Sequence, residues 1–159
     1  MQSHYAHLLL KHGLAALLVG LLAGFFLIFS MIGGMSLSPI PVLIAFELPG
    51  SPQGWRIVHL GMLLNGLMAI GLALLMRRVF LDSGQAFRVF AGVAIAVWGN
   101  FCFYIFGMFA PNHGVTLEAN RLGEASMAGA LAFFPALLGA ITLIYAVSVL
   151  LRAEPEAAQ

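Results

Sequence analysis

The stretch ELPGSPQGWRIVHLGMLLNG, residues 47–66, decides how this chain folds. It opens with a turn rich in proline and glycine and continues from Trp55 as a long apolar run. Such a run can cross a bilayer, because about 20 apolar residues span the hydrocarbon core. Two polar side chains, His59 and Asn65, fall within it. Because polar and ionisable groups are costly at that depth and commonly mark functional sites, the stretch predicts a membrane helix that carries a site.

Composition places the whole chain in a membrane. Of its 159 residues, 62% are hydrophobic and only 8% are charged, and the mean hydropathy is +1.01. A soluble domain has roughly 25% charged residues. The net charge is only +1, whereas nucleic-acid-binding proteins are strongly basic, so we expect no nucleic-acid partner. Cys102 is the only cysteine and cannot form an intrachain disulfide.

Four long apolar runs predict an all-α fold, an integral membrane four-helix bundle that forms a single domain over residues 1–159. The expected spans are about 13–32, 55–76, 89–110 and 125–151. Gly20 and Gly24 form a GxxxG pair, which either marks a close helix contact or arises by chance in a glycine-rich span. The polar tail, residues 152–159, is expected to be disordered.

Residues 33–55 separate the first two spans and contain many prolines and glycines. Such breakers exclude a regular helix, yet SPIPVLIAF at 38–46 is too apolar for a free loop. We expect a structured segment that lies on the membrane or packs over the mouth of the bundle. Glu47, near its end, reads as a solvated loop carboxylate.

The distribution of basic residues predicts the orientation. Five of the seven fall on the side of the termini and two on the other; the five are Lys11, Arg77, Arg78, Arg88 and Arg152. By the positive-inside rule, both termini then lie in the cytoplasm.

The polar side chains of the second and third spans are expected at similar depths. At ~1.5 Å per residue, His59, Asn65, Asn100 and Tyr104 all fall roughly 5 to 15 Å from the outer surface. Asn100 and Tyr104 share one helix face, and adjacent antiparallel spans could turn all four groups towards one cavity. His59 and Asn65 lie about 120° apart on their helix, so only a large planar ligand or a cavity wrapping the helix would meet both.

Each of these residues has a simpler interpretation. Asn65 and Asn100 could bond across helices, Tyr104 could belong to the interfacial aromatic belt, and Trp98 could be a core residue. His59 could be a structural histidine or a haem or metal ligand. No second histidine is expected within a span, which favours a single axial ligand over a bis-histidine haem.

Several motifs carry a resemblance to a known family. They are PGSPQGW at 49–55 followed by His59 and Asn65, then Trp98 and Asn100 with FYIF at 103–106, and FAPNHG at 109–114 with Asn120. With this order and spacing, from about Gly13 to the fourth span, the chain resembles the bacterial membrane-bound styrene oxide isomerases.

The resemblance implies a function and a site. Members of that family are four-span homotrimers of the cytoplasmic (inner) membrane that hold haem b between subunits. They convert aryl epoxides to aldehydes, a Meinwald rearrangement. By position, His59 would be the axial ligand of the haem iron, and Asn65 and Tyr104 would line the substrate pocket. Further pocket candidates are Asn100, Trp98 and Trp55.

One position departs from the family pattern, which has an acidic residue two before the tryptophan of the third span. This chain has Ala96 there. Two other functions therefore stay open. One is a haem-binding or other ligand-binding membrane protein without catalysis, and the other is a structural subunit of a membrane complex in which His59 merely packs.

Overall fold

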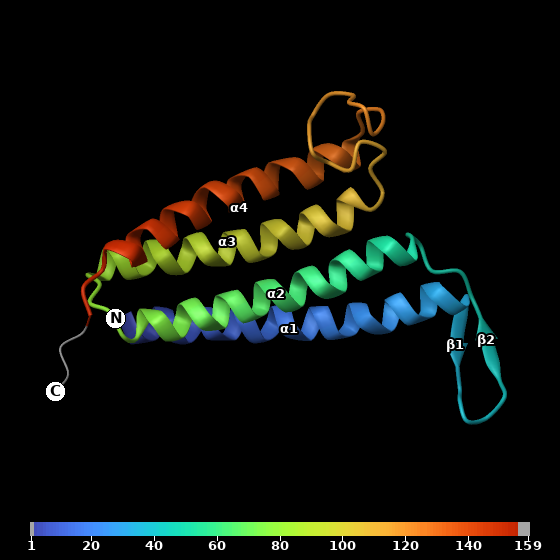
Figure 1. Cartoon of the computed structure of the whole chain (residues 1–159), viewed down its shortest axis with the longest axis horizontal. Coiled ribbons are helices and arrows are strands. Elements are labelled where there is room, and N and C mark those ends of the chain that lie inside the picture. Colours follow the sequence, from blue (N-terminus) through green and yellow to red (C-terminus); the bar gives the residue numbers. More distant parts are fainter. Residues whose placement is uncertain (1, 156–159) are drawn as a thin grey trace.

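The computed structural model describes residues 2–155, which form four long helices and one small strand hairpin (Figure 1). The helices are α1 (Gln2–Ile32), α2 (Pro52–Met76), α3 (Ser83–Gly107) and α4 (Met127–Arg152). All four are long and apolar enough to cross a membrane. The prediction of an all-α bundle of four membrane helices is confirmed.

Side chains at the helix starts explain where α2, α3 and α4 begin. Ser51 accepts a hydrogen bond from the Gly54 N–H and Ser126 accepts one from the Gly129 N–H. Asp82 and Gln85 form a capping box before α3. These contacts satisfy N–H groups that a helix start otherwise leaves without a partner.

Helix α1 begins at Gln2 rather than near residue 13, where its apolar run starts. The Gln2 side-chain amide donates hydrogen bonds to the backbone carbonyls of Met76 and Val79, the latter at 2.6 Å. These bonds tie the first turn of α1 to the connection after α2. The basic and polar residues 2–12 are therefore helical.

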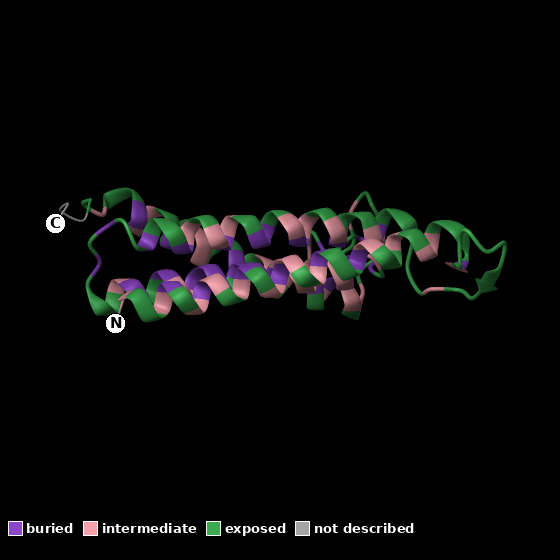
Figure 2. Ribbon diagram, turned by 90° about the horizontal axis from the view of Figure 1, so that it is seen from below, coloured by how far each residue is buried: buried purple, intermediate pink, exposed green. Residues whose placement is uncertain are grey.

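The bundle consists of two closely packed helix pairs. Helix α1 packs along α2 and α3 along α4, whereas contacts between the two pairs are much sparser. Gly20 and Gly24 lie at the α1–α2 contact, where an added Cβ would meet Leu63 or His59 at about 3.0 Å. The GxxxG pair therefore marks a real helix contact. Figure 2 shows the buried residues on the facing sides of the helices and the exposed ones outside.

The segment after α1 forms an antiparallel hairpin of β1 (Gly34–Ser36) and β2 (Leu43–Ala45). It projects beyond the end of α1 (Figure 1), and residues 36–47 are exposed. Glu47 is among them. The segment is structured, as expected, but it does not pack over the bundle mouth, because Gly33, with φ 68°, directs the chain away from the bundle. That it lies on the membrane stays a prediction.

The start of α1, the end of α4 and the connection between α2 and α3 lie at one end of the bundle (Figure 1). There the Phe80 N–H donates to the Glu154 carbonyl at 2.8 Å. The first part of the polar tail is thus paired with the connection, and residues 156–159 lie outside the described part of the chain.

Candidate active site

A hydrogen-bonded cluster joins α2 to α3 in the interior of the bundle. The Asn65 side-chain N–H₂ donates to the Gly61 carbonyl at 2.8 Å and to the Tyr104 hydroxyl oxygen at 3.1 Å. Asn100 donates to the Asn65 side-chain oxygen at 2.8 Å. Asn65 is buried, with 6% of its surface exposed. The structure thus brings together three of the candidate residues through bonds across helices.

A glycine allows the Tyr104 ring to reach this cluster. A Cβ atom on Gly61 would lie only 2.4 Å from a ring carbon of Tyr104, so the ring packs directly on the α2 backbone. The hydroxyl accepts a bond from Asn65, and its own O–H has no acceptor among residues 2–155. That proton is available to a bound ligand.

His59 faces α1 and not this cluster. Its Nδ1 lies 2.7 Å from the Gly20 carbonyl oxygen, and the Gly61 backbone that carries the Tyr104 ring is about 200° away around α2. The expectation that all four polar groups turn towards one cavity is therefore wrong within a single chain. Close packing on α1 is the reason: a Cβ atom on Gly24 would lie 3.0 Å from the imidazole, and the Gly20 carbonyl bonds to it.

The hydrogen bond of His59 fixes which ring nitrogen is free. A carbonyl can only accept, so Nδ1–H is the donor, and in the neutral ring Nε2 then carries a lone pair. Nε2 has no hydrogen-bond partner in the described chain. Histidines that bind metals commonly donate their other N–H to a carbonyl in this way. The orientation of His59 fits a single axial haem ligand. Such a ligand needs no cluster of acidic, cysteine or histidine side chains, and residues 2–155 contain no cluster of this kind.

Helix α1 contains three histidines, His4, His7 and His12, and His12 is the one that contacts α3. The Trp98 indole N–H donates to His12 Nδ1 at 2.9 Å. An indole can only donate, so in the neutral ring Nε2 carries the proton and has no lone pair for a metal. His59 is thus not alone among the histidines in helices long enough to cross a membrane, and its being the only one within the bilayer stays a prediction. The spacing of Ala6, Leu9, Gly13 and Ala16 was the available signal, since it continues one helix face through His12.

The profile of the family described as styrene oxide isomerase matches residues 5–154. The chain belongs to the styrene oxide isomerase family. A curated relative, the styrene-oxide isomerase of Pseudomonas fluorescens, is 31% identical over 139 residues, which cover 87% of this chain and 82% of the relative.

In this member of the styrene oxide isomerase family, both tryptophans use their indole N–H groups internally. Trp98 donates to His12, and Trp55 donates to the Pro49 carbonyl at 3.0 Å while its ring packs on Phe26. Trp55 also lines an apolar groove of about 270 Å³ between α1, α2 and α3. Trp55 therefore forms part of a wall and Trp98 packs against the core, and neither has a free N–H to offer a ligand.

Ala96, which replaces the acidic residue of the family pattern, lies on the α4 side of α3. It is buried, and a Cβ added to Gly139 of α4 would lie 2.9 Å from its Cα. An acidic side chain at this position would start from the tight α3–α4 contact, one helical turn before Asn100. The cluster therefore forms without that acid.

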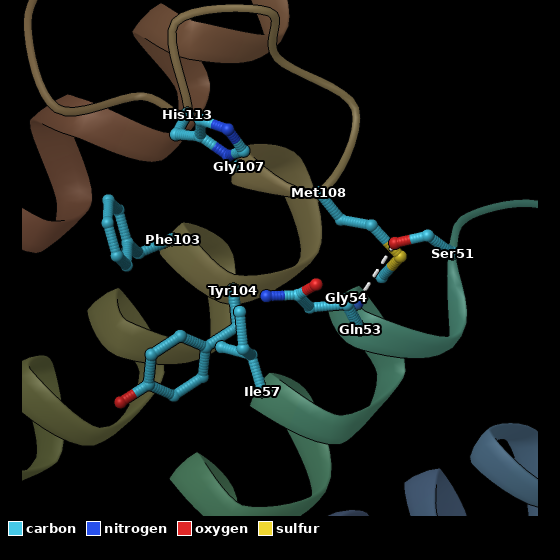
Figure 3. Close-up of a pocket in the computed structure, with 9 residues that line it drawn as sticks. All are labelled: Ser51, Gln53, Gly54, Ile57, Phe103, Tyr104, Gly107, Met108 and His113. Carbon is cyan, nitrogen blue, oxygen red and sulfur yellow. Dashed lines mark hydrogen bonds between the residues drawn. The ribbon is translucent and has the colours of Figure 1, made fainter. Parts of the chain in front are cut away.

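A cavity of about 400 Å³ opens beside Tyr104, between the start of α2 and the end of α3 (Figure 3). Besides Tyr104 it is lined by Ser51, Gln53, Gly54, Ile57, Phe103, Gly107, Met108 and His113. The sequence motifs contain many of these residues. The sequence did not predict that they line a pocket, because the pocket depends on how α2 packs against α3 and the loop that follows α3.

Proposed function

We propose that this family member isomerises aryl epoxides, such as styrene oxide, to aldehydes, and that it uses ferric haem b held by His59. Epoxide isomerisation is the activity for which the family is named. The observation that supports haem is the His59 ring itself, whose Nδ1–H is bonded to Gly20 and whose Nε2 is left free. A purely structural histidine needs no free nitrogen.

Bound ferric haem would supply a Lewis acid that polarises the epoxide C–O bond. The chain would supply orientation and charge stabilisation through Tyr104, whose O–H can donate to the epoxide oxygen as negative charge develops there. Asn65 fixes that hydroxyl by donating to its oxygen, and Asn100 fixes Asn65 in turn. Asn100 thereby restricts the side-chain conformation of Asn65, and Asn65 restricts that of Tyr104.

The reaction itself needs no external reductant or oxidant. The benzylic C–O bond opens, and a hydride moves from the terminal carbon to the benzylic carbon, which yields the isomeric aldehyde. Water would instead give a diol. Apolar walls such as Ile57, Phe103 and Met108 beside Tyr104 favour isomerisation because they keep water from the developing cation.

We further propose that the protein works as a homotrimer in the inner membrane with both termini in the cytoplasm. In one chain His59 of α2 faces α1, whereas Tyr104 of α3 packs on the other side of α2, so haem on His59 could meet the Tyr104 cluster of a neighbouring copy. The outer faces of α1 and α4 are apolar and largely exposed in the single chain. Either lipid or other copies can cover them, and a lipid-dissolved epoxide could approach there.

The visible spectrum and turnover of the purified protein test the proposal directly. We expect an intense Soret band and conversion of styrene oxide to phenylacetaldehyde in the ferric state, with a different rate after reduction by dithionite. Haem without turnover of any aryl epoxide would indicate a haem-binding protein. Protein without haem or turnover would indicate a structural subunit.

A complementation experiment tests whether the site is shared between copies. His59→Ala and Tyr104→Phe remove one part each, so co-expressed chains should form some sites that contain an intact His59 and an intact Tyr104. At equal total protein, we expect activity clearly above the average of the two variants expressed alone. Activity equal to the average of the separate variants would show that each chain carries a complete site.

A further inference from the structure

The cavity beside Tyr104 has polar groups at its outer rim that the proposed reaction does not use. Gln53 at the start of α2 and His113 in the loop after α3 line it, and neither side chain has a hydrogen-bond partner among residues 2–155. We propose that His113, with Gln53, binds a polar substituent on the aryl ring of the substrate. This inference rests on the proposed epoxide isomerisation and adds a specificity site to it.

The backbone of His113 points to a role beyond structure. It is the non-glycine residue with positive φ in the described chain, at 55°. Side chains with a Cβ disfavour this conformation, which glycine adopts freely. Residues held in this way cluster at active sites and ligand clamps. A loop selected for stability alone would gain from glycine at this position.

The surrounding loop holds His113 in place. Asn112 is fully buried, and its N–H₂ donates to the Thr116 and Glu118 carbonyls at 2.9 and 3.2 Å. Its side-chain oxygen accepts from the Gly114 N–H at 3.1 Å, and the His113 N–H donates to the Ala110 carbonyl at 2.9 Å. These bonds hold the backbone on both sides of His113, and the imidazole lines the cavity.

The walls of the cavity indicate what it would bind. Phe103, Ile57 and Met108 line its middle, the Tyr104 ring forms its inner end, and His113 lies at the opposite end (Figure 3). Its volume of about 400 Å³ falls within the usual range for small-molecule sites, roughly 300–1,000 Å³. An occupant with its epoxide near Tyr104 would direct its aromatic ring outward and a ring substituent towards His113 and Gln53. The inferred ligand class is aryl epoxides with a hydrogen-bonding group on the ring, and a para substituent reaches furthest from the epoxide.

The test compares 4-(hydroxymethyl)styrene oxide with 4-ethylstyrene oxide, which has nearly the same shape but no hydroxyl. We measure kcat/KM for both substrates in the parent and in His113→Gly, which removes the imidazole and suits the positive φ. We expect the preference for the hydroxymethyl substrate to fall by about 10-fold, mainly through KM, the scale of one lost hydrogen bond. His113→Asn tolerates positive φ and can still bond, so it should keep part of the preference. Val115→Ala, in the same loop but outside the cavity, is the matched control.

Thermal unfolding separates this role from a structural one. We expect His113→Gly to unfold at the same or a higher temperature than the parent, because its backbone strain is relieved. An unchanged substrate preference in a folded His113→Gly protein would overturn the inference and leave the isomerase proposal intact. Equal loss of activity on both substrates with lower stability would also overturn it. Failure of the parent to turn over any aryl epoxide would overturn the proposed function and this inference together.

Discussion

Replacing His59 with alanine is expected to abolish haem binding and to reduce epoxide turnover by at least roughly 10³-fold, because a Lewis acid supplies several kcal/mol of transition-state stabilisation. The imidazole is only half-buried and packs on the backbone of Gly20 and Gly24. Its removal leaves those helix contacts in place, so the protein should still insert and assemble. The measurements are the Soret absorbance per chain, the activity and the elution volume in detergent.

The matched control for His59 is His12. The substitution His12→Gln keeps an oxygen that can accept the Trp98 N–H, and it changes a histidine whose Nε2 carries the proton in the neutral ring. We expect this variant to keep its haem. A full Soret band in His59→Ala, or its loss in a folded His12→Gln protein, would contradict the assignment of His59 as the ligand.

Replacing Tyr104 with phenylalanine is expected to lower kcat by about 10²-fold, the scale of losing one positioned hydrogen-bond donor. Haem content and stability should change little, because phenylalanine keeps the ring on Gly61 and Asn65 retains its 2.8 Å bond to the Gly61 carbonyl. The measurements are single-turnover rates with styrene oxide and the Soret absorbance of the same samples.

Tyr145→Phe provides the comparison for Tyr104→Phe. Tyr145 is exposed on α4, far in sequence from the cluster and outside the cavity, so the same loss of a hydroxyl should leave turnover at the parent level. Parent-like turnover in folded, haem-loaded Tyr104→Phe would assign Tyr104 to the packing between α2 and α3.

The helices and the Asn65 cluster could be predicted from the sequence because both follow from local spacing. The length of an apolar run is enough to identify a membrane helix. Asn100 and Tyr104 are four residues apart, so they share a face, and an antiparallel neighbour at similar depth brings Asn65 to them. Only the identity of the donors and acceptors had to come from the structure.

Other features depended on contacts between distant parts of the chain. The contact of His59 with α1 depends on Gly20 and Gly24. Gly20, whose carbonyl bonds to the imidazole, is 39 residues away in the sequence. The early start of α1 depends on Gln2 reaching the carbonyl of Val79. The backbone of His113 depends on a buried asparagine amide. No periodicity in the sequence carries this information.

The pairing of α1 with α2 and of α3 with α4 also has a consequence for biogenesis. During synthesis, α1 and α2 are made before Asn100 and Tyr104. If this pair inserts first, the Asn65 amide lies in hydrocarbon with the Gly61 carbonyl as its hydrogen-bond partner. When the second pair inserts, Tyr104 and Asn100 bond to Asn65 and reduce the cost of burying its amide. These hydrogen bonds then hold together two helix pairs that otherwise have few contacts. Substitution of Asn65 is therefore expected to lower the yield of complete bundles.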